Sequence, residues 1–152
     1  MMQLDATDRK ILKALQDDAR MQNADLARSL DLAPSATLAR IRKLENAKVL
    51  QGYEARVDPD VIEAGLLTFV FIRTDEAAGD TAAAKAMAKL PEVLEVHHVA
   101  GDDGYLVKIR VADTAALAKL LREKLGKIRN IRSIKTAIVL ETVKESGKIP
   151  IA

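Results

Sequence analysis

The stretch PSATLARIRKLENAK, from Pro34 to Lys48, contains the residues that most clearly indicate a chemical function. It carries Arg40, Arg42 and Lys43 close together, and its single acid is Glu45. Cations on one helix face neutralise phosphates, and Arg can also bind guanine through two hydrogen bonds. We predict DNA contacts from an exposed arc that begins with small residues; its members are Ser35, Ala36, Thr37, Ala39, Arg40, Arg42 and Lys43. An ordinary solvated helix is the alternative interpretation.

The opposite side of that helix is predicted to be buried. On a wheel of about 100° per residue, Leu38, Ile41 and Leu44 fall together. Pro34 suits the first position of a helix. Two shorter helices are expected before it, one capped by Asp5 with an apolar stripe of Ile11, Leu12, Leu15 and Ala19, and one over Ala24–Leu30 capped by Asn23. Three short helices with a tight turn indicate a helix-turn-helix.

After Pro59 the pattern changes to strands alternating with helices. Strands are expected over Leu66–Thr74, on either side of GDDG, and in the last apolar run from Ile131 to Val143, with helices from Asp80 and from Asp113. This order predicts a ferredoxin-like βαββαβ domain and an α+β fold overall. The strands are apolar on both faces, whereas two helices cover only one face. We therefore expect a second copy of the chain on the other face.

Few other residues indicate chemistry. The sequence has no Cys, which excludes disulfides and thiolate metal sites. His97 and His98 are adjacent on a strand, so they point to opposite faces and do not form one metal site. We predict no catalytic residue, no metal and no cofactor. The first residues do not resemble a signal peptide, and no segment has the ~18 apolar residues of a membrane span. A cytoplasmic protein with no membrane partner is expected.

Several spaced motifs then carry a resemblance that covers essentially the whole chain. In order they are L-D-x-x-D-x-x-I-L from Leu4, Arg20 with Leu26 and Ala27, R-x-x-x-L-E from Arg40, and Gln51-Gly52-Tyr53. Together they resemble the N-terminal winged helix-turn-helix of the Lrp/AsnC, or feast/famine, transcription regulators. The resemblance continues through Gly101, Tyr105 and the terminal segment. The domains expected are residues 1–52 for DNA, a linker at 53–65, and a ligand-binding and oligomerisation domain at 66–152.

The resemblance implies a mechanism. Members of this family are dimers, often assembled into octamers, that bind double-stranded DNA through paired recognition helices. Amino acids or related small molecules bind between their C-terminal domains. The corresponding effector residues here are Gly101, Asp102, Asp103, Gly104, Tyr105 and Thr136. Asp103 and Gly104 depart from the usual G-D-Y-D-Y loop, and Ala33 replaces the usual Ser before the recognition helix. Two alternatives stay open: an enzyme resembling the siroheme decarboxylases, and a small-molecule sensor without DNA binding.

Overall fold

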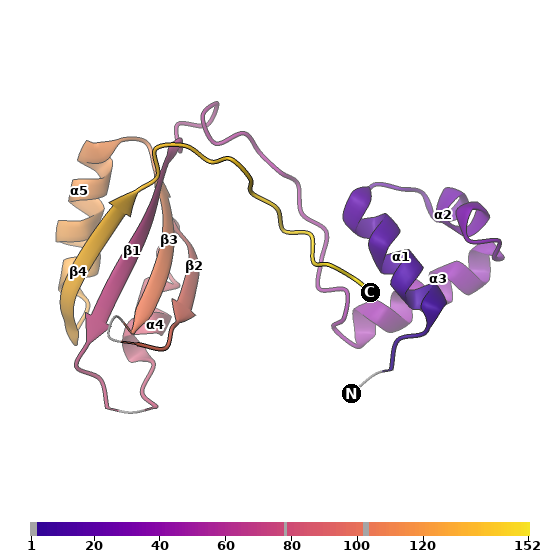
Figure 1. The fold of residues 1–152 in the computed structure, drawn as a ribbon, viewed down its shortest axis with the longest axis horizontal. Coiled ribbons are helices and arrows are strands. Elements are labelled where there is room, and N and C mark those ends of the chain that lie inside the picture. Colours follow the sequence, from indigo (N-terminus) through magenta and orange to yellow (C-terminus); the bar gives the residue numbers. More distant parts are fainter. Residues whose placement is uncertain (1–2, 78, 102–103) are drawn as a thin grey trace. The chain divides into compact units, whose positions relative to one another are not determined.

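The computed structural model describes residues 3–77, 79–101 and 104–152, and the chain divides into two compact units (Figure 1). The helical unit comprises the residues up to Arg56 together with Lys144–Ala152. The sheet unit comprises Val57–Val143. These bounds differ from the expected domains, because the last segment of the chain belongs to the helical unit.

The helical unit is built on α1 (Ala6–Asp17), α2 (Asn23–Ser29) and α3 (Pro34–Asn46). As expected, Asp5 caps α1: its carboxylate accepts from the Asp8 N–H, and the Asp8 carboxylate accepts from the Asp5 N–H. The buried core of the unit consists of Ile11, Leu12, Leu15, Leu26, Ile41 and Leu44. The prediction that Ala19 joins this stripe is wrong, because α1 ends at Asp17 and Ala19 is exposed.

A tight turn joins α2 to α3, which confirms the helix-turn-helix. The Leu32 N–H donates to the Ala27 carbonyl, and Asp31 takes a left-handed φ of 55°. Asn23 is not the cap of α2, contrary to expectation; Gln22 is the N-cap and makes no side-chain bond. The Asn23 amide instead donates to the Pro34 carbonyl at 2.9 Å. Asn23 therefore ties α2 to the first turn of α3.

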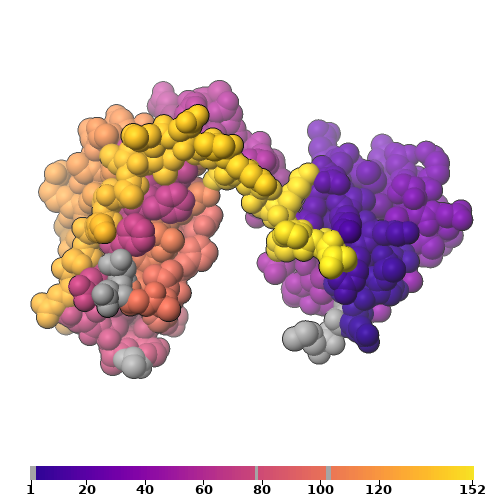
Figure 2. Space-filling model, in the orientation of Figure 1, coloured from indigo at the N-terminus to yellow at the C-terminus, as the bar shows by residue number. Residues whose placement is uncertain are grey.

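The C-terminal tail, defined as residues 144–152, lies on α1. The Gln16 side chain donates to the Ile149 carbonyl at 3.0 Å and accepts from the Ile149 N–H at 2.6 Å. Lys148 pairs with Asp17, and Ile151 packs against the helical core. Figure 2 shows the yellow tail against the indigo surface of the first helix. The tail is thus part of the helical unit.

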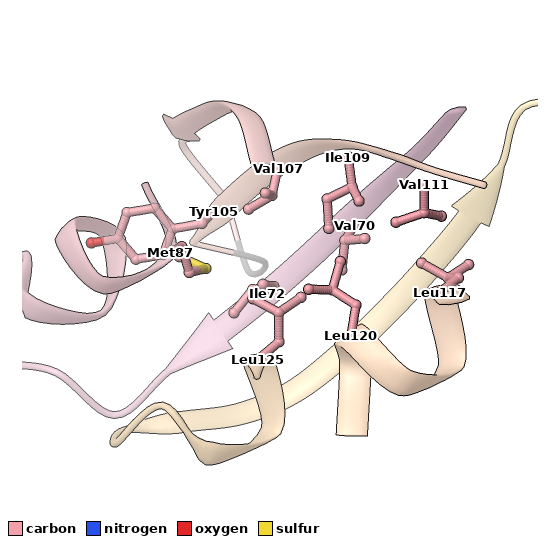
Figure 3. Close-up of a cluster of buried hydrophobic side chains, with 10 residues drawn as sticks. All are labelled: Val70, Ile72, Met87, Tyr105, Val107, Ile109, Val111, Leu117, Leu120 and Leu125. Carbon is pink, nitrogen blue, oxygen red and sulfur yellow. The ribbon is translucent and has the colours of Figure 1, made fainter. Parts of the chain in front are cut away.

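The sheet unit has the expected βαββαβ order. Its elements are β1 (Leu66–Thr74), α4 (Ala82–Met87), β2 (Val93–His98), β3 (Tyr105–Val111), α5 (Thr114–Glu123), a 3₁₀ turn η1 (Leu125–Lys127) and β4 (Ile131–Ile138). The four strands are antiparallel in the order β2-β3-β1-β4. One face packs on α4 and α5 around an aliphatic core (Figure 3), made of Val70, Ile72, Met87, Tyr105, Val107, Ile109, Val111, Leu117, Leu120 and Leu125.

Two details of the sheet unit differ from expectation. The strand β4 ends at Ile138, so the segment to Val143 is not strand. The helix α4 is a short piece, although its expected run began at Asp80. The expected cap of α5 is confirmed, since the Asp113 carboxylate accepts from the Ala116 N–H. Residues 47–65, all of which are described, contain no strand.

The sheet face opposite the helices, here called the open face, mixes apolar and charged groups. Phe71 lies beside Leu106 on β3 and Lys135 on β4, and Phe69 lies beside Lys108. The Lys135 ammonium is 5.7 Å from the centre of the Phe71 ring. Both phenylalanines are only half-buried in the single chain. This face therefore keeps apolar surface that its own helices do not cover.

Candidate DNA-binding surface and effector site

The start of α3 is arranged without a side-chain cap. Ala33 is its N-cap residue and makes no side-chain hydrogen bond, as its methyl group requires. Pro34 follows at the first helical position, where its missing N–H costs nothing. Asn23 from α2 holds the Pro34 carbonyl. The N-terminal turn of α3 is therefore positioned by α2 and not by its own cap.

The buried side of α3 is centred differently from the prediction. Thr37 is 0% exposed, whereas Leu38 is 38% exposed. On the helical wheel Thr37 falls between Ile41 and Leu44, and Leu38 lies at the edge of that face. The Thr37 hydroxyl donates to the Ala33 carbonyl at 3.2 Å, which satisfies it inside the helix. The expectation that Thr37 contacts DNA is therefore corrected: its side chain has no access to a groove.

The remaining candidates separate into two groups. Ser35, Ala36, Ala39, Arg42 and Lys43 are exposed along one side of α3. Small residues come first along this side, which lets backbone approach another surface closely, and the two cations follow. Within the described residues, neither cation takes part in an ion pair.

Arg40 differs from both of these cations. Its side chain is 34% exposed, and its Nη1 lies 2.7 Å from Asp5 Oδ2 and 2.8 Å from Asp8 Oδ1. Hydrogen bonds from the Asp8 N–H and from Arg40 lower the pKa of Asp5. The same two carboxylates raise the pKa of Arg40. Arg40 therefore joins α3 to the N-terminal cap of α1.

Charge is unevenly divided between the two units. The helical unit has twelve Lys and Arg against nine Asp and Glu, a net charge of +3, whereas the sheet unit has twelve against thirteen, a net charge of −1. The positive charge of the chain thus belongs to the unit that contains α3. A positive net charge favours association with the phosphate backbone.

Tyr53, the last residue of the Gln51-Gly52-Tyr53 motif, contacts the last turn of α3. The Tyr53 hydroxyl donates to Glu45 Oε1 at 3.0 Å. Burial and this neighbouring carboxylate raise the pKa of Tyr53 to about 12. Tyr53 therefore stays protonated in the neutral range, and it keeps Glu45 occupied beside the cations of α3.

The expected effector loop connects β2 to β3. Gly101 and Gly104 have positive φ angles of 115° and 68°, and the Val99 N–H donates to the Gly104 carbonyl at 2.8 Å. Asp102 and Asp103 lie outside the described residues. The hairpin is confirmed, but its strands end at His98 and resume at Tyr105, so it is longer than a two-residue turn.

The structure separates the other two effector candidates. Tyr105 is buried on the helix-covered face of β3, with its ring 5.0 Å from that of His98. Burial raises the pKa of Tyr105, and the charges of Glu76 and Asp80 add to the shift. Thr136 is exposed on β4, beyond β1. Strands two positions apart are about 10 Å apart, so one chain does not bring Thr136 to the hairpin.

The histidines lie on opposite faces of β2, as expected. His97 Nε2 is 3.0 Å from Glu95 Oε2 on the open face, whereas His98 contacts Tyr105 on the other face. Among the described residues, no three His, Cys, Asp or Glu side chains are grouped to hold a metal ion. The described helices also include none long and apolar enough to cross a membrane.

Comparison with known proteins decides the family. A profile described as Lrp/AsnC ligand binding domain matches residues 67–149, and one described as winged helix-turn-helix DNA-binding matches residues 4–51. This chain belongs to the Lrp/AsnC family. It is 40% identical over 150 residues to the leucine-responsive regulatory protein of Klebsiella pneumoniae, which covers 97% of this chain and 92% of the relative. The family consists of transcriptional regulators with a DNA-binding helix-turn-helix and a ligand-binding domain.

Solved structures of other Lrp/AsnC regulators have the same fold. A transcriptional regulator from Neisseria meningitidis, solved as a complex with L-methionine, matches with a TM-score of 0.90 at 29% identity and covers 97% of both chains. The feast or famine regulatory protein of M. tuberculosis, complexed with L-methionine, has a TM-score of 0.90 at 32% identity and covers 99% of this chain and 100% of its own. The fold of this chain is therefore the fold of solved Lrp/AsnC transcriptional regulators.

Proposed function

We propose that this regulator binds double-stranded DNA through the exposed side of α3. The observation that carries the proposal is the row of small residues followed by Arg42 and Lys43 on a helix that the turn after α2 presents outward. Neither cation pairs with an acid in the part of the chain that the structure describes. Small residues at the start of the helix allow close approach to base edges. The cations then neutralise phosphates.

The DNA-binding form in this proposal is a homodimer. Phe69, Phe71 and Leu106 supply apolar surface on the open face, which the helices of the sheet unit leave uncovered and a second copy can bury. Two copies related by a two-fold axis present two recognition helices to successive major grooves of a pseudo-palindromic site. Assembly of dimers into a higher homo-oligomer, with the octamer as the family precedent, belongs to the same proposal.

The proposed effector is an amino acid or a related small molecule. Two structural neighbours were solved with L-methionine, which supports this class of ligand. The proposed site is the loop from Gly101 to Tyr105 together with Thr136 of another copy, because Thr136 of the same chain lies beyond β1. An effector there bridges copies, so its binding free energy acts on assembly.

The proposed role is regulatory and not enzymatic, and its proposed location is the cytoplasm. Family membership supports the regulatory role, since the relatives are transcriptional regulators. The same proposal includes no cofactor, no metal and no membrane partner.

A mobility-shift titration tests the proposal. The purified protein is mixed with DNA from upstream of its own gene, with and without each of the twenty amino acids. We expect a specific shift that competitor DNA of unrelated sequence does not remove, and that one amino acid or chemical class alters. A specific shift indifferent to all twenty contradicts the effector class but keeps the regulator. No shift, even at low salt, contradicts DNA binding by α3.

A further inference from the structure

Arg40 lies on the recognition helix but makes contacts unlike those of the cations beside it. Arg42 and Lys43 are exposed, whereas the Arg40 side chain is two-thirds buried and reaches the start of α1. One nitrogen of its guanidinium, Nη1, binds carboxylates of both Asp5 and Asp8. These three residues are here called the clamp.

The two acids of the clamp are held rigidly by the backbone. Each of Asp5 and Asp8 accepts a hydrogen bond from the other's N–H, in the capping box of α1. The Asp8 side chain is only 3% exposed. A buried carboxylate is costly unless a cation pairs with it, and among the described residues Arg40 is the cation that pairs with Asp8.

Charge and geometry together argue against a phosphate contact by Arg40. The clamp contains two carboxylates and one guanidinium, so its formal charge is −1 and it has no positive charge to spare. If Arg40 moved to a phosphate, it would leave a buried carboxylate unpaired beside incoming DNA. Both consequences oppose DNA binding.

We propose that Arg40 is a positioning residue: it fixes α3 against the N-terminus of α1 and pairs with two acids beside the DNA-binding surface, which leaves the clamp with a charge of −1 instead of −2. This inference rests on the proposed DNA binding by α3. It divides the cations of the recognition helix into two kinds. Arg42 and Lys43 release counterions from DNA when the protein binds, whereas Arg40 acts through Asp5 and Asp8 and releases none.

The test compares four forms of the full chain: wild type, Arg40→Gln, the triple variant Arg40→Gln with Asp5→Asn and Asp8→Asn, and the control Arg42→Gln. Asn retains the capping acceptor, so the triple variant keeps a hydrogen-bonded but uncharged clamp. Affinity for one mixed-sequence DNA duplex is measured by fluorescence anisotropy across a salt series. The slope of log affinity against log salt counts the neutralised phosphates.

The control should lower that slope by about 0.9 for each recognition helix bound, because Arg42 is expected to contact phosphate. Arg40→Gln alone should weaken binding, since it changes the formal charge of the clamp beside the surface from −1 to −2. The triple variant should regain wild-type affinity and slope. The inference is overturned if the triple variant binds as poorly as Arg40→Gln and its slope falls as far as that of the control.

A second measurement covers the case in which a variant does not fold. The guanidinium signals of wild-type Arg40 and Arg42 are followed by NMR as the duplex is added. We expect those of Arg42 to shift and those of Arg40 to keep their carboxylate-bound positions; a shift of Arg40 alone rejects the inference. If wild-type protein binds no duplex at low salt, the proposed function fails. In that case the part of the inference that concerns DNA fails as well. The structural role of the clamp is kept only if Arg40→Gln lowers the melting temperature and the triple variant restores it.

Discussion

Thr37→Val tests which side of α3 faces DNA. The Thr37 hydroxyl donates to the Ala33 carbonyl at 3.2 Å, and that carbonyl also accepts the Thr37 N–H at 3.0 Å. When the hydroxyl is removed, the Ala33 carbonyl therefore still accepts a hydrogen bond from the Thr37 N–H. A hydrogen bond contributes about 0.5–1.5 kcal/mol, and this long one belongs in the lower half of that range. A methyl group buried in its place returns up to about 0.8 kcal/mol.

These two contributions nearly cancel, so Thr37→Val should change the free energy of unfolding by less than about 1 kcal/mol. Thr37→Ala should cost about 1–2 kcal/mol, because it leaves a void at a fully buried position. For a unit of this size, each 1 kcal/mol corresponds to roughly 4–8 °C in Tm. The Ala variant should therefore lower the Tm of the helical unit by roughly 4–16 °C.

DNA affinity distinguishes burial from contact. Thr37→Val should bind DNA like the wild type, whereas the exposed control Ser35→Ala should leave the Tm unchanged and weaken binding. Thermal unfolding followed by circular dichroism gives the Tm, and anisotropy titration gives the affinity. A tenfold loss of affinity in Thr37→Val with an unchanged Tm would refute the reasoning, since it would require a DNA contact from the buried side of α3.

Three further predictions concern other parts of the chain. Hydrogen bonds lower the pKa of Asp5 in the folded state. Asp5 therefore stabilises the fold fully above the pKa that it has in the unfolded chain, and this stabilisation is lost as the pH falls through its pKa in the folded state. The Tm should therefore drop below about pH 4, and less so in Asp5→Asn. Gly104→Ala should cost about 1–2 kcal/mol, measured by urea unfolding, because φ is 68° and the new Cβ would lie 3.2 Å from the Ile72 carbonyl oxygen; an unchanged midpoint would exclude that strain. Ile151→Ala should cost about 1 kcal/mol by the same measurement, because Ile151 is partly buried against the helical core, and no loss would mean that the tail does not pack.

Local signals predicted much of the fold. Asp5, Asp113 and Pro34 act on backbone groups within a few residues, and each begins its helix as expected. The order of strands and helices in the sheet unit followed from hydrophobic periodicity. A helical wheel that counts only aliphatic residues places Leu38 in the buried face of α3. Including Thr37 moves the centre of the buried face away from Leu38.

The side-chain contacts that the sequence does not predict join residues far apart along the chain. The Asn23 amide binds Pro34, eleven residues away, instead of capping its own helix. Arg40 finds its partners thirty-two and thirty-five residues away. Asp5 and Asp8 belong to one family motif and Arg40 to another, but neither motif states which charges pair in the fold. The Gln16–Ile149 contact, across 133 residues, had no signal in the sequence at all.

The C-terminal tail on α1 also determines when the helical unit can complete its fold during synthesis. The ribosome synthesises α1, α2 and α3 first, and it synthesises the tail that lies on α1 only after residues 57–143. At about 5–20 residues per second, that interval is roughly 4–17 seconds. Throughout it, Gln16 and the apolar surface that receives Ile151 face solvent or the ribosome. The helical unit thus reaches its final form only after the whole sheet unit has been synthesised, although its first helix is made at the start.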